Sequence, residues 1–144
     1  MLKGIPAILS PDLFKIMLEM GHGDEIVISD GNFPAASCAQ RLVRCDGHHV
    51  PELLEAILKF FPVEEEEDFT ATLMAVDTDN ARELPPIWEE YRSILEQEID
   101  NSVEFGYIER YEFYERAKNA YAVVATSEKA LYGNIILKKG VVTE

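Results

Sequence analysis

The chain has 144 residues, of which 47% are hydrophobic, so it can form one domain with its own core and is short for two. Asp and Glu number 27 against 13 Lys and Arg, which gives a net charge of −14 at pH 7. Nucleic acids and anionic membranes both require clustered basic side chains, and we therefore expect neither as a partner. No hydrophobic run has the length of a membrane span or the form of a signal peptide, so we expect a cytoplasmic protein.

Four helices are predicted from capping residues and apolar stripes. Ser10 is an N-cap residue followed by Pro11, which suits the first helical position, and apolar residues then recur at helical spacing. Prolines also mark the start of a second helix at Pro51 and of a third at Pro85–Pro86. A fourth helix is expected over about 111–119.

Six short segments have the composition or the alternation of strands. They are residues 25–30, 41–45, 70–76, 103–107, 121–125 and 134–138. Strands and helices thus mix along the whole length, with no internal repeat and no linker. This order predicts one α/β domain over residues 1–144, with helices on both faces of a largely parallel sheet.

Several kinds of chemistry find no support in the sequence. No glycine pattern matches a dinucleotide or phosphate-binding loop, no serine lies in a nucleophile elbow, and we expect no cofactor. His48 and His49 are adjacent and have no cluster of further ligands at metal-site spacing, so we expect no metal. Cys38 and Cys45 could pair, but reduced thiols are the expectation. The acidic run 64–68 is expected to be a solvated connector.

Two polar residues near the first strand are candidates for a functional site. His22 lies between two glycines in an otherwise bare loop, where local hydrogen bonding is the commoner role for a histidine. An imidazole that titrates near neutral pH can also donate and accept protons, and the glycines leave room for a ligand. Asp30 follows the strand either as a turn former or as an acceptor for the hydroxyls of a ligand.

Two further candidates lie in the last third of the chain. Tyr132, Gly133 and Asn134 lead into the final strand and supply a phenol, a bare backbone and an amide, which suit a polyhydroxyl compound or an ordinary turn. Arg110 precedes an aromatic cluster, where it is either a surface charge or a fixed donor over a sugar ring. None of these residues is decisive alone.

Together the candidates lie in segments that resemble a known family. The two longest are GHGDEIVISDGNFPA (21–35) and ERYEFYERAKNAYAVVATSEKALYGNIILKKGV (109–141). They closely resemble the D-ribose pyranase/fucose mutarotase family, in its L-fucose mutarotase branch. The shorter segments LKGIPAILSPDL, RCDGH and VPELLEAIL are also similar to it. The resemblance covers nearly the whole chain and thins between residues 62 and 102.

The resemblance implies a three-layer α/β/α sandwich of the ribose pyranase type. It implies an isomerase that opens and recloses L-fucose by acid–base chemistry and so interconverts its α and β anomers. His22 would be the catalytic residue, and the sugar would be bound by Asp30, Arg110, Tyr132, Gly133 and Asn134. Arg110 stands where the ribose branch tends to have histidine, which favours fucose. The implied assembly is a homo-oligomer, a ring or a dimer of rings.

Two alternatives remain open from the sequence. One is pyranose–furanose interconversion of D-ribose, and the other is a sugar-binding module without turnover. The spacing of the candidates adds a constraint, because residues 25–30, extended at about 3.3 Å each, would hold His22 and Asp30 roughly 20 Å apart. We therefore expect each site to combine His22 of one subunit with residues of a neighbour.

Overall fold

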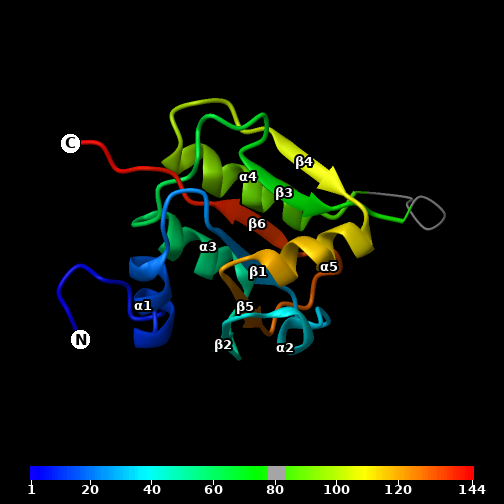
Figure 1. Ribbon diagram of the computed structural model, residues 1–144, viewed down its shortest axis with the longest axis horizontal. Coiled ribbons are helices and arrows are strands. Elements are labelled where there is room, and N and C mark those ends of the chain that lie inside the picture. Colours follow the sequence, from blue (N-terminus) through cyan, green and yellow to red (C-terminus); the bar gives the residue numbers. More distant parts are fainter. Residues whose placement is uncertain (78–83) are drawn as a thin grey trace.

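The structure is a computed structural model of the chain and describes residues 1–77 and 84–144. The helices are α1 (Pro11–Glu19), α2 (Ala35–Cys38), α3 (Val50–Leu58), α4 (Ile87–Glu98) and α5 (Arg110–Asn119) (Figure 1). The strands are β1 (Glu25–Ser29), β2 (Leu42–Cys45), β3 (Ala71–Met74), β4 (Phe105–Ile108), β5 (Ala122–Thr126) and β6 (Ile135–Lys138). All four predicted helices and all six predicted strands are present, and α2 was not predicted.

The six strands form one sheet in the order β2-β5-β1-β6-β3-β4. Parallel pairing joins β2, β5 and β1 on one side and β3 and β4 on the other, whereas β6 runs antiparallel to both β1 and β3. The prediction of a largely parallel sheet is therefore confirmed. Because β6 is reversed, it begins at the end of the sheet where β1 and β5 terminate, and it terminates where they begin.

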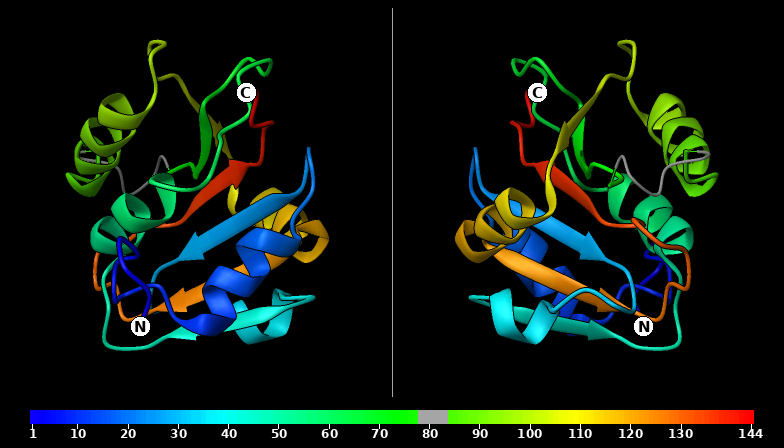
Figure 2. Two further views of the ribbon diagram at one scale, coloured as in Figure 1. Left: turned by 90° about the vertical axis from the view of Figure 1, so that its left-hand side faces the viewer. Right: turned by 90° about the vertical axis from the view of Figure 1, so that its right-hand side faces the viewer.

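Helices cover both faces of the sheet, as the alternation of strand residues requires. Ile26 and Ile28 pack in one cluster with α1, α3 and α4, while Val27 between them packs in a second cluster with α2 and α5. Figure 2 shows α3 and α4 on one side of the strands and α2 and α5 on the other. The predicted three-layer α/β/α sandwich is confirmed.

Local capping explains where the helices begin. Ser10 Oγ accepts a hydrogen bond from the Leu13 amide at 3.2 Å, so α1 starts at the proline that follows Ser10. The Glu109 carboxylate accepts from the Glu112 amide at 2.8 Å and starts α5 at Arg110. The missed helix α2 has only 4 residues, which is too short for an apolar stripe to repeat.

Two expectations from composition concern the whole chain. Within the described residues, no helix is long and apolar enough to cross a membrane. Cys38 and Cys45 are both buried and unpaired, as expected for reduced thiols.

Candidate active site

Asp30 is held at the end of the sheet where β1 terminates. Its side chain is buried, and its amide donates to Asn134 Oδ1 at 2.7 Å. Its carboxylate accepts from the amides of Asn32 at 3.0 Å and Gly133 at 3.3 Å. Burial raises the pKa of Asp30, and the hydrogen bonds from the Asn32 and Gly133 amides act in the opposite direction. These hydrogen bonds connect the end of β1 to the start of β6.

The turn before β6 has an unusual backbone that α4 holds in place. Tyr132 has a φ of 57°, in the left-handed region that non-glycine residues rarely adopt. Trp88 Nε1 donates to the Tyr132 carbonyl at 2.9 Å, and the buried Tyr91 hydroxyl donates to the Gly133 carbonyl at 2.7 Å. A Cβ at Gly133 would come within 3.1 Å of the Ala130 carbonyl oxygen, so the tight packing of the turn favours glycine there. The half-buried phenol of this turn is therefore positioned by hydrogen bonds that Trp88 and Tyr91 donate to its backbone.

Arg110 lies at the start of α5, next to this turn. Its Nε donates to the Tyr114 hydroxyl at 2.8 Å, and the guanidinium lies 5.4 Å from the ring centroid of Tyr111. The hydrogen bond with Tyr114 is the largest cause of the raised pKa of Arg110, followed by the charge interactions with Tyr114 and Tyr111. Tyr114 and Tyr132 also pack against the same apolar cluster. We call Asp30, Arg110 and Tyr132–Asn134 the Asp30 end of the sheet.

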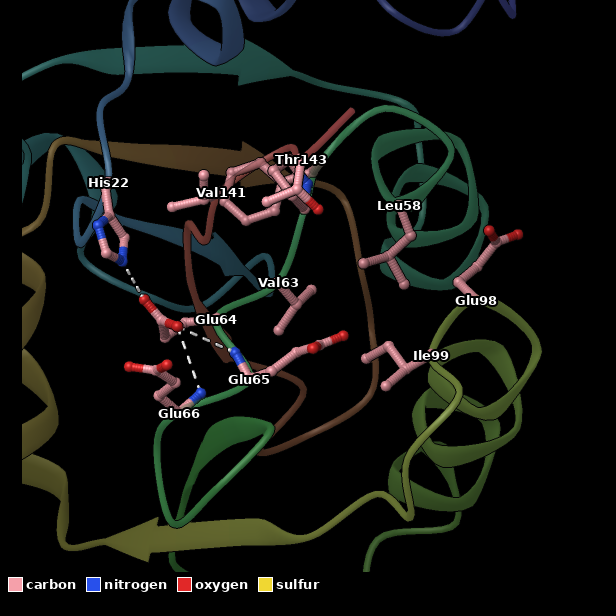
Figure 3. Close-up of a pocket in the computed structure, with 12 residues that line it drawn as sticks. His22, Leu58, Val63, Glu64, Glu65, Glu66, Glu98, Ile99, Val141 and Thr143 are labelled. Atoms are coloured by element: carbon pink, nitrogen blue, oxygen red, sulfur yellow. Dashed lines mark hydrogen bonds and ion pairs between the residues drawn. The ribbon is translucent and has the colours of Figure 1, made fainter.

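His22 lies beyond the other end of β1. Its loop pairs with the residues that follow β6: Gly23 donates to the Lys139 carbonyl at 2.8 Å, and Lys139 donates to the Asp24 carbonyl at 2.8 Å. The loop therefore does not fold back along β1, and His22 stays apart from Asp30 by the length of the strand. The imidazole is 59% exposed and its Nε2 contacts the carboxylate of Glu64 (Figure 3). We call His22, Glu64 and Lys138–Gly140 the His22 end of the sheet.

A cavity of about 400 Å³ opens beside His22. Figure 3 shows His22 on one wall and Ile99 on the opposite one, with Val63 and Glu64 between them. Acidic groups, the imidazole and apolar side chains thus face one hollow. Across residues 1–77 and 84–144, no three His, Cys, Asp or Glu side chains gather as ligands for a metal ion.

One expectation needs correction at this end. The acidic run was predicted to be solvated, and residues 65–68 are exposed, but the side chain of Glu64 is only 14% exposed. The reason is its contact with His22, reinforced by the Glu64 amide, which donates to the Lys138 carbonyl at 2.9 Å. Glu67 also has a partner, since Lys138 Nζ donates to it at 2.6 Å. A run of like charges gives no periodic signal that would have distinguished Glu64.

The structure therefore gathers five of the six predicted site residues at one end of the sheet and leaves His22 at the other. Comparison of the sequence with known protein families shows that residues 3–142 match the RbsD / FucU transport protein family. The chain belongs to this family.

Individual relatives are similar over nearly the whole chain. It is 52% identical to the fucose mutarotase of Homo sapiens, over 97% of this chain and 94% of that protein. It is 44% identical to the L-fucose mutarotase of Histophilus somni, over 98% of this chain and 97% of that protein.

Solved structures of two sugar complexes are also similar to this chain. The crystal structure of the fucose mutarotase in complex with L-fucose from Streptococcus pneumoniae has a TM-score of 0.93 at 50% identity, covering 99% of this chain and 100% of that chain. Bacillus subtilis RbsD complexed with D-ribose has a TM-score of 0.71 at 26% identity, covering 99% and 100%.

Proposed function

We propose that the chain is an L-fucose mutarotase, an isomerase that interconverts the α and β anomers of L-fucose. The observation that carries this is the full-length match to a fucose-bound mutarotase, with a TM-score of 0.93 at 50% identity. The match to the ribose-bound relative is weaker, with a TM-score of 0.71 and a sequence identity of 26%.

Mutarotation needs only the movement of a proton. The hydroxyl at C1 loses its proton, the ring oxygen gains one, the C1–O5 bond breaks and a C1 aldehyde forms. Rotation of the aldehyde followed by reclosure gives the other anomer, with no leaving group and no redox change. General acid–base catalysis of this kind contributes about 10²–10⁴-fold.

In the proposed site, His22 accepts the proton and returns it. Its exposure and its position beside the cavity support this role. Asp30 and Asn134 hold sugar hydroxyls, Tyr132 hydrogen-bonds near the anomeric centre, and Arg110 stabilises negative charge on oxygen as the hemiacetal breaks. The left-handed turn at Tyr132, held from behind by Trp88 and Tyr91, supports a fixed binding surface there.

The proposed site is shared between subunits of a homo-oligomeric ring. A monosaccharide is shorter than the span of β1, so one molecule cannot touch His22 and Asp30 of the same chain. A neighbour that brings its Asp30 end to the cavity at His22 completes the site, and the symmetry of a ring repeats the contact. We also place the protein in the cytoplasm, which its two unpaired cysteines support.

Saturation-transfer NMR on sugars already at anomeric equilibrium tests the function. The protein should transfer saturation between the C1 protons of α- and β-L-fucose. Exchange confined to the pyranose and furanose forms of D-ribose would replace this proposal with a ribose pyranase. Sugar binding without exchange in either sugar would identify a binding module.

A further inference from the structure

The contact between His22 and Glu64 is built by the backbone on both sides of it. Residues 138–140 lie between the loop of His22 and the segment that carries Glu64. On one side Gly23 and Asp24 pair with Lys139, and on the other the Glu64 amide donates to the Lys138 carbonyl at 2.9 Å. The Gly140 amide also donates to the Pro62 carbonyl at 2.7 Å. Two segments 42 residues apart in the sequence are thereby fixed face to face.

The carboxylate of Glu64 is itself held in one orientation. Its Oε1 accepts from the amides of Glu65 at 3.1 Å and Glu66 at 3.3 Å, while its Oε2 contacts His22 Nε2 (Figure 3). The hydrogen bond with His22 is the largest cause that lowers the pKa of Glu64. The carboxylate is therefore ionised at neutral pH and can only accept hydrogen bonds.

An acceptor at Nε2 decides which nitrogen of a neutral imidazole carries the proton. Nε2 must be protonated to donate to Glu64, which leaves Nδ1 with a free lone pair. Nδ1 lies on the side of the ring that faces away from Glu64 in Figure 3. The side of the ring turned away from Glu64 thus presents a base, and the side held by Glu64 presents a donor.

We propose that Glu64 is a positioning residue for the mutarotase reaction: it holds His22 in the Nε2–H tautomer, so that Nδ1 is the atom that exchanges the proton with the sugar. This inference rests on the proposed function. Nδ1 takes the proton from the C1 hydroxyl, and the resulting imidazolium is stabilised by the Glu64 carboxylate. The same proton then passes from Nδ1 to the ring oxygen as the C1–O5 bond breaks, and reclosure reverses these transfers.

The tautomer is measured directly by ¹⁵N NMR of histidine-labelled protein at a pH where His22 is neutral. The chain has 3 histidines, so His22→Ala identifies the signals of His22. The expected result is a pyrrole-type shift at Nε2 and a pyridine-type shift at Nδ1. Glu64→Ala should remove this preference, whereas Glu64→Gln should keep it because the amide oxygen still accepts. A His22 that is protonated at Nδ1, or is unaffected by Glu64→Ala, overturns the proposal.

Kinetics separate positioning from simple loss of charge. Glu64→Ala should lower kcat for anomer exchange by about 10–100-fold, the usual loss when a carboxylate that orients a histidine is removed, with KM within about twofold of wild type. Glu64→Gln should lose less. Glu66→Ala is the matched control, because it removes a neighbouring charge while the Glu66 backbone amide that binds Glu64 remains. Equal losses of kcat in Glu64→Ala and Glu66→Ala would contradict the inference.

Two outcomes distinguish this inference from the proposed function. Full exchange by His22→Ala would refute the role of His22 itself. An inactive His22→Ala together with a fully active Glu64→Ala would refute only the role of Glu64. If Glu64→Ala does not fold by circular dichroism, the wild-type protein and the near-isosteric Glu64→Gln decide: a wild-type Nδ1–H tautomer, or a Glu64→Gln variant in which His22 loses the Nε2–H preference, contradicts it.

Discussion

The two ends of β1 differ in how they hold their functional side chains. At the Asp30 end the carboxylate is buried and its neighbours are fixed by hydrogen bonds from two strand ends and from α4. At the His22 end the imidazole is 59% exposed, and Glu64 holds it at Nε2. The difference follows the proposed roles, since binding hydroxyls requires fixed partners, whereas a proton carrier requires one accessible nitrogen. Changes at the two ends should therefore affect different quantities.

The largest effect is expected from His22→Ala. This variant should lose anomer exchange by about 10²–10⁴-fold, because the proton carrier is gone, while fucose still binds through the Asp30 end. Saturation transfer gives the exchange rate and calorimetry gives the affinity. His48→Ala is a suitable control, since His48 is a partly exposed histidine that pairs with Glu52 instead. Near-wild-type exchange in His22→Ala would break the proposed division of roles.

Mixing two inactive variants tests whether the two ends meet across a subunit boundary. His22→Ala and Asp30→Ala, dissociated and reassembled together, should regain about a quarter of wild-type exchange in a random closed oligomer. A quarter is expected because half of the subunits supply each intact end. Mass spectrometry checks that mixed oligomers form. If they form without any activity, the site lies within one chain.

Tyr91→Phe should weaken the Asp30 end from behind. It leaves the buried Gly133 carbonyl without its donor, which should reduce the free energy of unfolding by about 1–3 kcal/mol and raise KM for fucose. Urea denaturation gives the first quantity and exchange kinetics the second. Tyr107→Phe, at a half-exposed tyrosine, should change neither. A stable Tyr91→Phe with wild-type KM would show that the turn keeps its shape without α4.

The smallest effect is a pH dependence of binding. Because burial raises the pKa of Asp30 above 3.8, its carboxylate should become protonated at a higher pH than an exposed one. The raised pKa of Asp30 also stabilises the folded state at low pH. This stabilisation is fully present below the pKa of the unfolded state and is lost as pH rises through the raised pKa of the folded state. KM for fucose should therefore rise as pH falls through the folded pKa of Asp30. Asp30→Asn should lack this acid limb, and a wild-type KM that stays constant down to pH 3.8 would argue against a role in binding.

The sequence predicted the layers better than it predicted the contacts within the site. Apolar runs such as 25–30 and the cap at Ser10 are local signals, and both elements are where they were expected. The reversed direction of β6 left no such signal, although it is what brings Asn134 to Asp30. The partner of His22 was missed for the same reason, since Glu64 is 42 residues away and lies in a run of identical charges.

The reversed strand β6 spans both ends of the sheet and so acts as a spacer between them. The turn at Tyr132–Asn134 enters it, and residues 138–140, which hold the loop of His22 and the segment of Glu64, leave it. A one-residue deletion in Ile135–Lys138 would invert the faces of its side chains and displace both ends at once. The length of β6 is therefore constrained by both ends of the sheet together.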